Sequence, residues 1–120
     1  MKQSHVLQLA CEPLPIVRIG FIGLGNRGMA TLRRYLVIDG VEIVALCDIH
    51  RAHLDEASAV IAADGKYTPC LLNAQDGWKQ MGQRDDIDLI YICTDWLTHA
   101  PMACYAMEQG KHVAIEVPAA

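Results

Sequence analysis

A glycine-rich turn narrows most sharply what this chain can fold into. Gly23, Gly25 and Gly28 form the pattern G-x-G-x-x-G, directly after the apolar run 16–22 and directly before a helical pattern. The first glycine of such a turn permits a tight bend, the second permits close approach to the backbone, and the third lets a helix pack near a strand. The pattern is weak evidence when it stands alone, but this context favours the first βα unit of a doubly wound sheet.

Short apolar runs alternate with helical patterns along the rest of the chain. The runs are β-branched and bounded by Gly, Asp or Pro, as in parallel strands buried on both faces. We expect strands over 16–22, 41–47, 87–93 and 112–117, with a weaker edge strand over 69–72. Helical spacing of apolar residues predicts helices around 29–36, 54–61 and 78–81, and a fourth from Thr98 to Gly110 with Pro101 in its first turn.

This alternation predicts an α/β fold with a doubly wound, mostly parallel sheet, which is the Rossmann NAD(P)-binding fold. The chain has 120 residues, which is enough for one domain and too few for two. We expect that domain to cover residues 16–120, after a flexible leader over residues 1–15.

Composition and charge exclude several classes of protein. A hydrophobic content of 52% is too high for a disordered chain, and a net charge of −4 without a basic stripe does not suit nucleic acid. No apolar run approaches the roughly 18 residues of a membrane-spanning helix. The 5 cysteines form no C-x-x-C pair, so we expect neither a metal site nor a disulfide framework, and a cytoplasmic location.

An acidic residue follows the second predicted strand. Asp48 lies 20 residues after Gly28 (48 − 28), the spacing at which a carboxylate accepts the hydroxyls of the adenosine ribose. It would repel a 2′-phosphate by roughly 4 kcal/mol per unit charge at about 4 Å and an effective dielectric near 20. The sequence therefore predicts NAD rather than NADP, although Arg51 is close enough to soften this repulsion. Two alternatives stay open: a glycine turn without a ligand, and Asp48 as a helix N-cap.

Further candidate ligands follow the other strands. The amides and dipole of the helix after the glycine turn favour a pyrophosphate, to which Arg27 can add a charged contact. Ligands of doubly wound sheets lie beyond the carboxyl ends of the strands, where the strand order reverses. We therefore expect Trp96, His99 and Glu116 to contact the nicotinamide side of the cofactor. His50 and His53 flank the second helix and are expected to be exposed.

Taken together, these residues resemble a known family. Residues 17–118 are similar to the nucleotide-binding half of the glucose–fructose oxidoreductase and inositol dehydrogenase family (Gfo/Idh/MocA), through 23–28, Asp48, 94–99 and 110–118. The resemblance implies hydride transfer with a sugar or glycoside substrate. Besides Gly23, Gly25, Gly28 and Thr94, it implies that NAD contacts Asn26, Arg27, Asp48, Trp96, Leu97, Thr98, His99, Glu116 and Val117.

Two departures from the family pattern shift the expected activity. Thr94-Asp95-Trp96 stands where the family usually has Thr-Pro-Asn, and Glu116-Val117-Pro118 stands where it usually has Glu-Lys-Pro. The missing lysine is commonly placed near the hydride-transfer centre. With His99, these residues look more like the branch that contains the NAD-dependent glycoside hydrolases of family 109. In that branch NAD oxidises a sugar hydroxyl, the leaving group is eliminated, water adds, and the hydride returns.

Family members continue beyond the Glu-x-Pro segment into a domain that carries substrate and catalytic residues. We therefore expect this chain to be the first part of a longer enzyme and to be inactive alone, and assign it no catalytic residue. Without that domain, the face that would meet it and the edge beyond the last strand are expected to be uncovered. We therefore predict self-association of this chain. Two other classes stay open: a non-catalytic nucleotide-binding module that ends at Ala120, and, as a distant third, a methyltransferase that binds S-adenosylmethionine.

Overall fold

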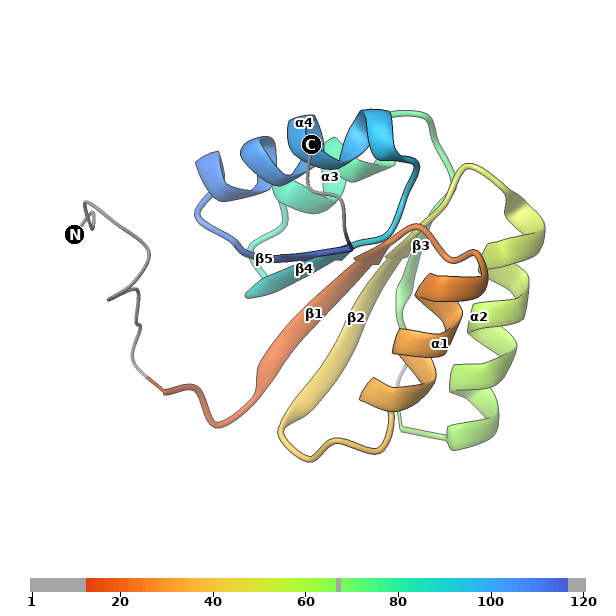
Figure 1. Ribbon diagram of the computed structural model, residues 1–120. Coiled ribbons are helices and arrows are strands. Elements are labelled where there is room, and N and C mark those ends of the chain that lie inside the picture. Colours follow the sequence, from red (N-terminus) through yellow and green to blue (C-terminus); the bar gives the residue numbers. More distant parts are fainter. Residues whose placement is uncertain (1–12, 67, 117–120) are drawn as a thin grey trace.

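The fold is a parallel five-stranded sheet with helices on both faces. The computed structural model describes residues 13–66 and 68–116, without the side chain of Trp96. Within them the strands lie in the order β3-β2-β1-β4-β5, and every neighbouring pair is parallel (Figure 1). Their bounds are β1 Val17–Ile22, β2 Val41–Cys47, β3 Cys70–Leu72, β4 Leu89–Ile92 and β5 His112–Ile115. The predicted Rossmann fold is confirmed.

The helices divide into two layers. They are α1 Asn26–Tyr35, α2 Arg51–Asp64, α3 Gly77–Gly82 and α4 Trp96–Glu108. Figure 1 shows α1 and α2 on one face of the sheet and α3 and α4 on the other. The chain extends from β1 through β2 to β3 in one direction and returns to place β4 on the opposite side of β1. The strand order therefore reverses between β1 and β4, and a cleft for a ligand is expected at their carboxyl ends.

Alternating side chains of the strands fill two separate cores. One face of the sheet buries Phe21 against α1 and α2, where Leu32 and Leu54 are fully buried. The other face buries Ile90 against α3 and α4, where Met81 is fully buried. Burying a large aliphatic side chain contributes roughly 1.5–3 kcal/mol. Because both faces are covered, the central strands are nearly continuous hydrophobic runs rather than alternating ones.

Several element boundaries differ from the predicted ones. The last helix begins at Trp96 rather than Thr98, because the Asp95 side chain caps it by accepting from the backbone N–H of Thr98 at 3.2 Å. The strand β4 is shorter than the apolar run 87–93. At its start the carboxylate of Asp88 accepts from the Arg18 guanidinium at 3.1 Å, which holds the pKa of Asp88 below its usual range.

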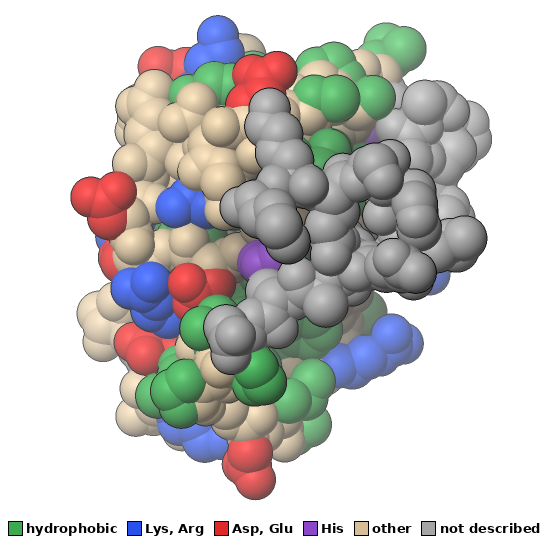
Figure 2. Space-filling model, turned by 90° about the vertical axis from the view of Figure 1, so that its left-hand side faces the viewer, with side chains coloured by type: hydrophobic (Ala, Val, Ile, Leu, Met, Phe, Trp, Pro, Cys, Tyr) green, Lys and Arg blue, Asp and Glu red, His purple; other side chains and the backbone are tan. Residues whose placement is uncertain are grey.

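The described surface carries mixed charge. In Figure 2, acidic and basic side chains are interspersed on the face shown. Among the residues that the structure covers, no three His, Cys, Asp or Glu side chains gather as metal ligands, and no helix is long and apolar enough to cross a membrane. Most of the predicted leader, residues 1–12, and the predicted ligand Val117 lie outside the described residues.

Candidate functional site

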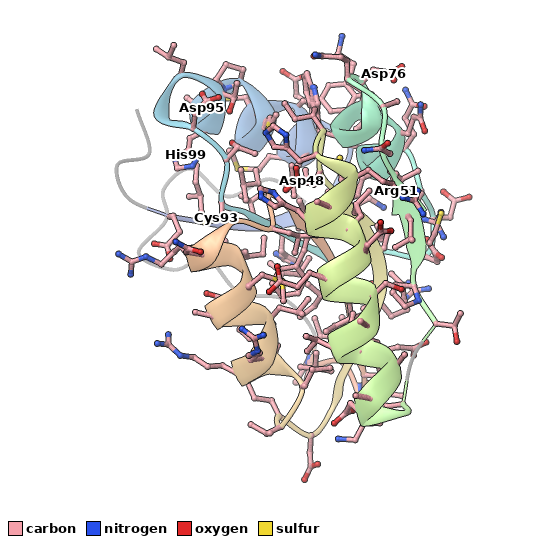
Figure 3. All side chains as sticks on the ribbon, turned by 90° about the vertical axis from the view of Figure 1, so that its right-hand side faces the viewer. Asp48, Arg51, Asp76, Cys93, Asp95 and His99 are labelled. Carbon is pink, nitrogen blue, oxygen red and sulfur yellow. The ribbon has the colours of Figure 1, made fainter. Side chains whose placement is uncertain are left out.

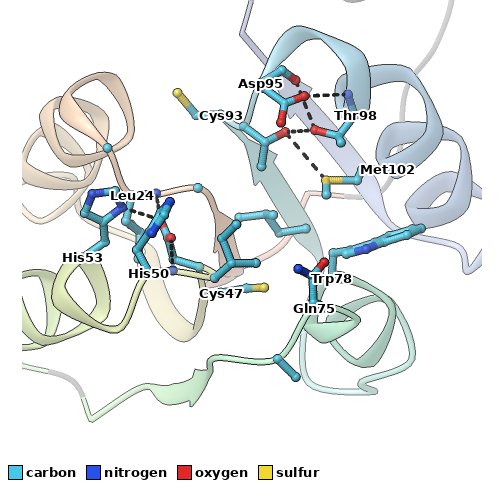
Figure 4. Close-up of a pocket in the computed structure, with 17 residues that line it drawn as sticks. Leu24, Cys47, His50, His53, Gln75, Trp78, Cys93, Asp95, Thr98 and Met102 are labelled. Carbon is cyan, nitrogen blue, oxygen red and sulfur yellow. Dashed lines mark hydrogen bonds and ion pairs between the residues drawn. The ribbon is translucent and has the colours of Figure 1, made fainter.

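A cavity of about 430 Å³ opens at the carboxyl ends of the strands, where the strand order reverses (Figure 4). The ends of β1, β2 and β4 form its floor, and the first turns of α2 and α4 and the segment after β3 form its walls. Of the residues predicted to bind the cofactor, the structure brings five together on its lining: Gly23, Gly25, Asp48, Thr94 and Thr98.

The three glycines of the turn have different structural roles. Gly23 has a φ of +91°, and a Cβ there would lie 2.2 Å from the carbonyl oxygen of Cys93. A Cβ at Gly28 would lie 2.1 Å from the carbonyl oxygen of Gly23, so this glycine lets α1 pack against the end of β1. Both positions are constrained by protein atoms rather than by a ligand.

Gly25 differs because the surrounding protein leaves room for a side chain at this position. A Cβ at this position would meet no heavy atom within 4 Å, and its φ of −73° suits any residue. Gly25 also caps α1 without any side-chain hydrogen bond to the first turn, where helix amides lack partners within the helix. The open space and these amide donors fit a pyrophosphate, and a Cβ would intrude on that space.

Asp48 links the glycine turn to the start of α2. Its side chain is only 7% exposed. Its Oδ2 accepts from the backbone N–H of Leu24 at 2.8 Å and lies 2.9 Å from Nδ1 of His53, while Oδ1 accepts from the backbone N–H of His50 at 2.7 Å (Figure 4). The N-cap of α2 is His50, so the N-cap alternative for Asp48 is wrong. A carboxylate has about four acceptor positions, which leaves one on Oδ1 for a ribose hydroxyl.

Arg51 does not soften the charge of Asp48. Its guanidinium lies 3.0 Å from the carboxylate of Asp55, one turn along α2, and it does not line the cavity (Figure 3). At short range the Asp48 carboxylate therefore has His53 as its side-chain partner, and Arg51 does not pair with it.

A hydrogen-bonded loop positions the opposite wall. The hydroxyls of Thr94 and Thr98 are 2.6 Å apart, and both residues reach the cavity. The His99 ring is 1% exposed, and its Nε2 lies 3.0 Å from the carbonyl oxygen of Thr94. His99 thus supports this loop from behind and does not line the cavity. Leu97 is 90% exposed and also lies off the cavity.

Glu116 is held by a tyrosine. The Tyr91 hydroxyl donates to Oε1 of Glu116 at 2.8 Å and lies 3.1 Å from the Thr31 hydroxyl of α1. Burial is the main cause that raises the pKa of Tyr91 to about 12, so the phenol keeps its proton at neutral pH. Glu116 does not line the cavity, and its contact with the cofactor stays a prediction.

Tyr91→Phe tests this link between β4, β5 and α1. We expect the free energy of unfolding to fall by about 1–2 kcal/mol, because buried Thr31 loses a partner while the ring still packs. Urea unfolding followed by circular dichroism measures it. Tyr105→Phe is the matched control, since its hydroxyl bonds only the exposed Gln83 in the described structure. An equal loss in both variants would contradict a special role for Tyr91.

The remaining predicted ligands that the structure describes do not line the main cavity. Asn26 borders a smaller hollow of about 140 Å³ that shares Gly25 and His53 with it. Arg27 is exposed and lines neither hollow, and Gly28 is buried beneath the turn. The side chain of Trp96 is not described.

The structure adds residues that the sequence analysis missed. His53, expected to be exposed, is half-buried against Asp48, whereas His50 is exposed as expected. Gln75 reaches the cavity from the loop after β3, Trp78 from α3 and Met102 from α4. Gln75 and Trp78 could have been predicted from the parallel sheet, because the carboxyl end of every strand faces this edge and both residues follow β3.

Two cysteines also line the cavity. Burial raises the pKa of Cys47 to about 12 and raises that of Cys93 above its usual value. Burial thus disfavours the thiolate at both positions.

Comparisons with known proteins extend this picture. Residues 17–120 match the oxidoreductase family described by its NAD-binding Rossmann fold. The chain is 62% identical over 118 residues to an alpha-N-acetylgalactosaminidase of Bacteroides fragilis, covering 98% of this chain and 28% of that protein. It is 48% identical over 120 residues to a glycosyl hydrolase family 109 protein of Phocaeicola vulgatus, covering 100% of this chain and 29% of that protein.

Solved structures show the same fold. The scyllo-inositol dehydrogenase of Lactobacillus casei with bound NAD(H) and scyllo-inositol superposes with a TM-score of 0.75 and 25% identity, over 87% of this chain and 28% of that one. The myo-inositol 2-dehydrogenase of Lactobacillus plantarum gives a TM-score of 0.75 and 28% identity, over 87% and 29%. The chain thus spans less than a third of the length of these relatives.

Proposed function

Because this chain belongs to the Gfo/Idh/MocA oxidoreductase family and is its NAD-binding Rossmann domain, we propose that it serves an NAD-dependent glycosidase rather than a sugar dehydrogenase. The observation that carries this proposal is the 62% identity to an alpha-N-acetylgalactosaminidase across nearly the whole chain. The inositol dehydrogenases share the fold at only 25–28% identity.

The residues of this chain bind and orient the cofactor. The open backbone at Gly25 and the amides of α1 receive the pyrophosphate, and Asp48 receives a ribose hydroxyl on Oδ1. Thr94 and Thr98 border the opposite wall. NAD bound there would supply a reversible hydride acceptor, which a glycosidase would use without net oxidation of the sugar.

The decisive experiment uses the full reading frame that contains this chain. With a chromogenic α-N-acetylgalactosaminide, we expect glycoside cleavage that requires NAD and accumulates no NADH. Steady NADH production from a free sugar without glycoside cleavage would instead establish a dehydrogenase. The same measurement with other glycosides defines the substrate.

Asp48→Asn tests the ribose site. We expect the ratio of the NADP Kd to the NAD Kd to fall about tenfold, because the neutral amide no longer repels a 2′-phosphate. Calorimetric titration of both nucleotides measures this ratio. Asp55→Asn is the matched control, since Asp55 is exposed and pairs with Arg51 away from the cavity. An unchanged ratio in Asp48→Asn would contradict the assigned role.

A further inference from the structure

The Asp48 carboxylate, proposed to bind the ribose, also forms a hydrogen bond with His53. Nδ1 of His53 lies 2.9 Å from Oδ2 of Asp48, and a carboxylate can only accept, so Nδ1 carries the proton of this hydrogen bond. The other ring nitrogen, Nε2, is then the position at which an additional proton would bind. The His53 side chain is 37% exposed, so water can deliver that proton.

His53 also lies beside the space proposed for the ribose. It lines the main cavity (Figure 4) and also the smaller hollow beside Gly25. Two backbone amides, those of Leu24 and His50, hold the Asp48 carboxylate independently of this ring. The imidazole is therefore not needed to orient Asp48, but it does decide the net charge of the pair.

We propose that His53 is a specificity-determining residue that makes the choice between NAD and NADP depend on pH. With a neutral imidazole, the pair carries the full negative charge of Asp48 and repels a 2′-phosphate. With an imidazolium, the pair is neutral and presents an N–H donor, so NADP is rejected less strongly. This inference rests on the proposed role of Asp48 at the ribose.

Other charged and titratable groups lie around His53. Its ring contacts that of His50, a second imidazole that lines the cavity, with centroids 5.0 Å apart. Glu56 of α2 and Arg33 of α1 border the smaller hollow with it, and their charged ends lie 4.0 Å from one another, so their opposite charges largely offset. Asp95 lines the cavity from the start of α4.

The test measures the Kd of NAD and of NADP by calorimetry between pH 8.0 and pH 6.0, which stays above the sequence pI of about 5.6. Imidazole is the side chain that gains a proton over this range. We expect the NADP-to-NAD ratio of Kd values to fall about fivefold or more in the unaltered chain. The 2′-phosphate also titrates near pH 6, so a variant must separate the two effects.

His53→Gln retains a hydrogen-bond donor for Asp48 but cannot become charged. We expect its Kd ratio to fall by about twofold or less over the same range, the remainder coming from the phosphate. His112→Gln is the matched control, since His112 is exposed at the start of β5, at the opposite edge of the sheet. The Kd ratio of this variant should change with pH as that of the unaltered chain does.

A second measurement follows the proton directly instead of the affinity. Binding enthalpies in two buffers with different ionisation enthalpies give the number of protons taken up. At pH 7 we expect the unaltered chain to take up more protons with NADP than with NAD, by a fraction that exceeds the same difference in His53→Gln. Equal Kd ratios and equal proton uptake in the unaltered chain and His53→Gln would overturn this inference alone. Failure of the unaltered chain to bind NAD at any pH would overturn the proposed cofactor site as well.

Discussion

Gly25→Ser is expected to weaken NAD binding about 100-fold, or about 2.7 kcal/mol, while the fold stays as stable as before. No protein atom within 4 Å opposes a Cβ at this position, and the backbone conformation suits serine. Serine is also at least as good an N-cap as glycine, so α1 loses nothing. The new side chain does, however, fill the space proposed for the pyrophosphate and competes for the amides of the first helical turn.

The measurement pairs calorimetric NAD titration with urea unfolding of the same sample. Ala30→Ser is the matched control, because Ala30 is exposed on the same helix and lines neither hollow. We expect that variant to bind NAD as the unaltered chain does. NAD affinity within about threefold of the unaltered value in Gly25→Ser would show that the pyrophosphate lies elsewhere.

Gly28→Ala is expected to lower the free energy of unfolding by about 2–3 kcal/mol. Its Cβ would lie 2.1 Å from the carbonyl oxygen of Gly23 and 3.0 Å from the carbonyl carbon, so backbone has to move. Alanine favours a helix over glycine by about 1 kcal/mol, but this gain is smaller than the cost of separating α1 from the end of β1. The displaced turn should also bind NAD more weakly.

Urea unfolding measures this loss, and Gly25→Ala provides the matched comparison within the same motif. The same atom is added three residues earlier, where the structure leaves room for it. We expect the Gly25 variant to lose at most about 1 kcal/mol, through its weaker N-cap. Equal stability of the two variants would mean that α1 does not approach β1 as described.

The main features of the fold were predictable because they follow from local patterns. β-branched runs separated by helical spacing require a parallel sheet, and the end of each strand must then face one edge. The residue pattern alone therefore predicts that Gly23, Gly25, Asp48 and Thr94 lie near one another. Membership of the NAD-binding family also excludes the methyltransferase alternative.

Spacing along the chain therefore fixes the sheet, the glycine turn and the acidic residue at the end of β2. Spacing does not fix which side chains face the cavity, because that depends on contacts made in three dimensions. His99 turned inward to bond the Thr94 carbonyl, Arg51 turned outward to Asp55, and His53 turned to Asp48. These directions depend on partners from neighbouring turns and loops, and hydrogen-bond geometry in three dimensions has no periodicity that a one-dimensional pattern can reveal.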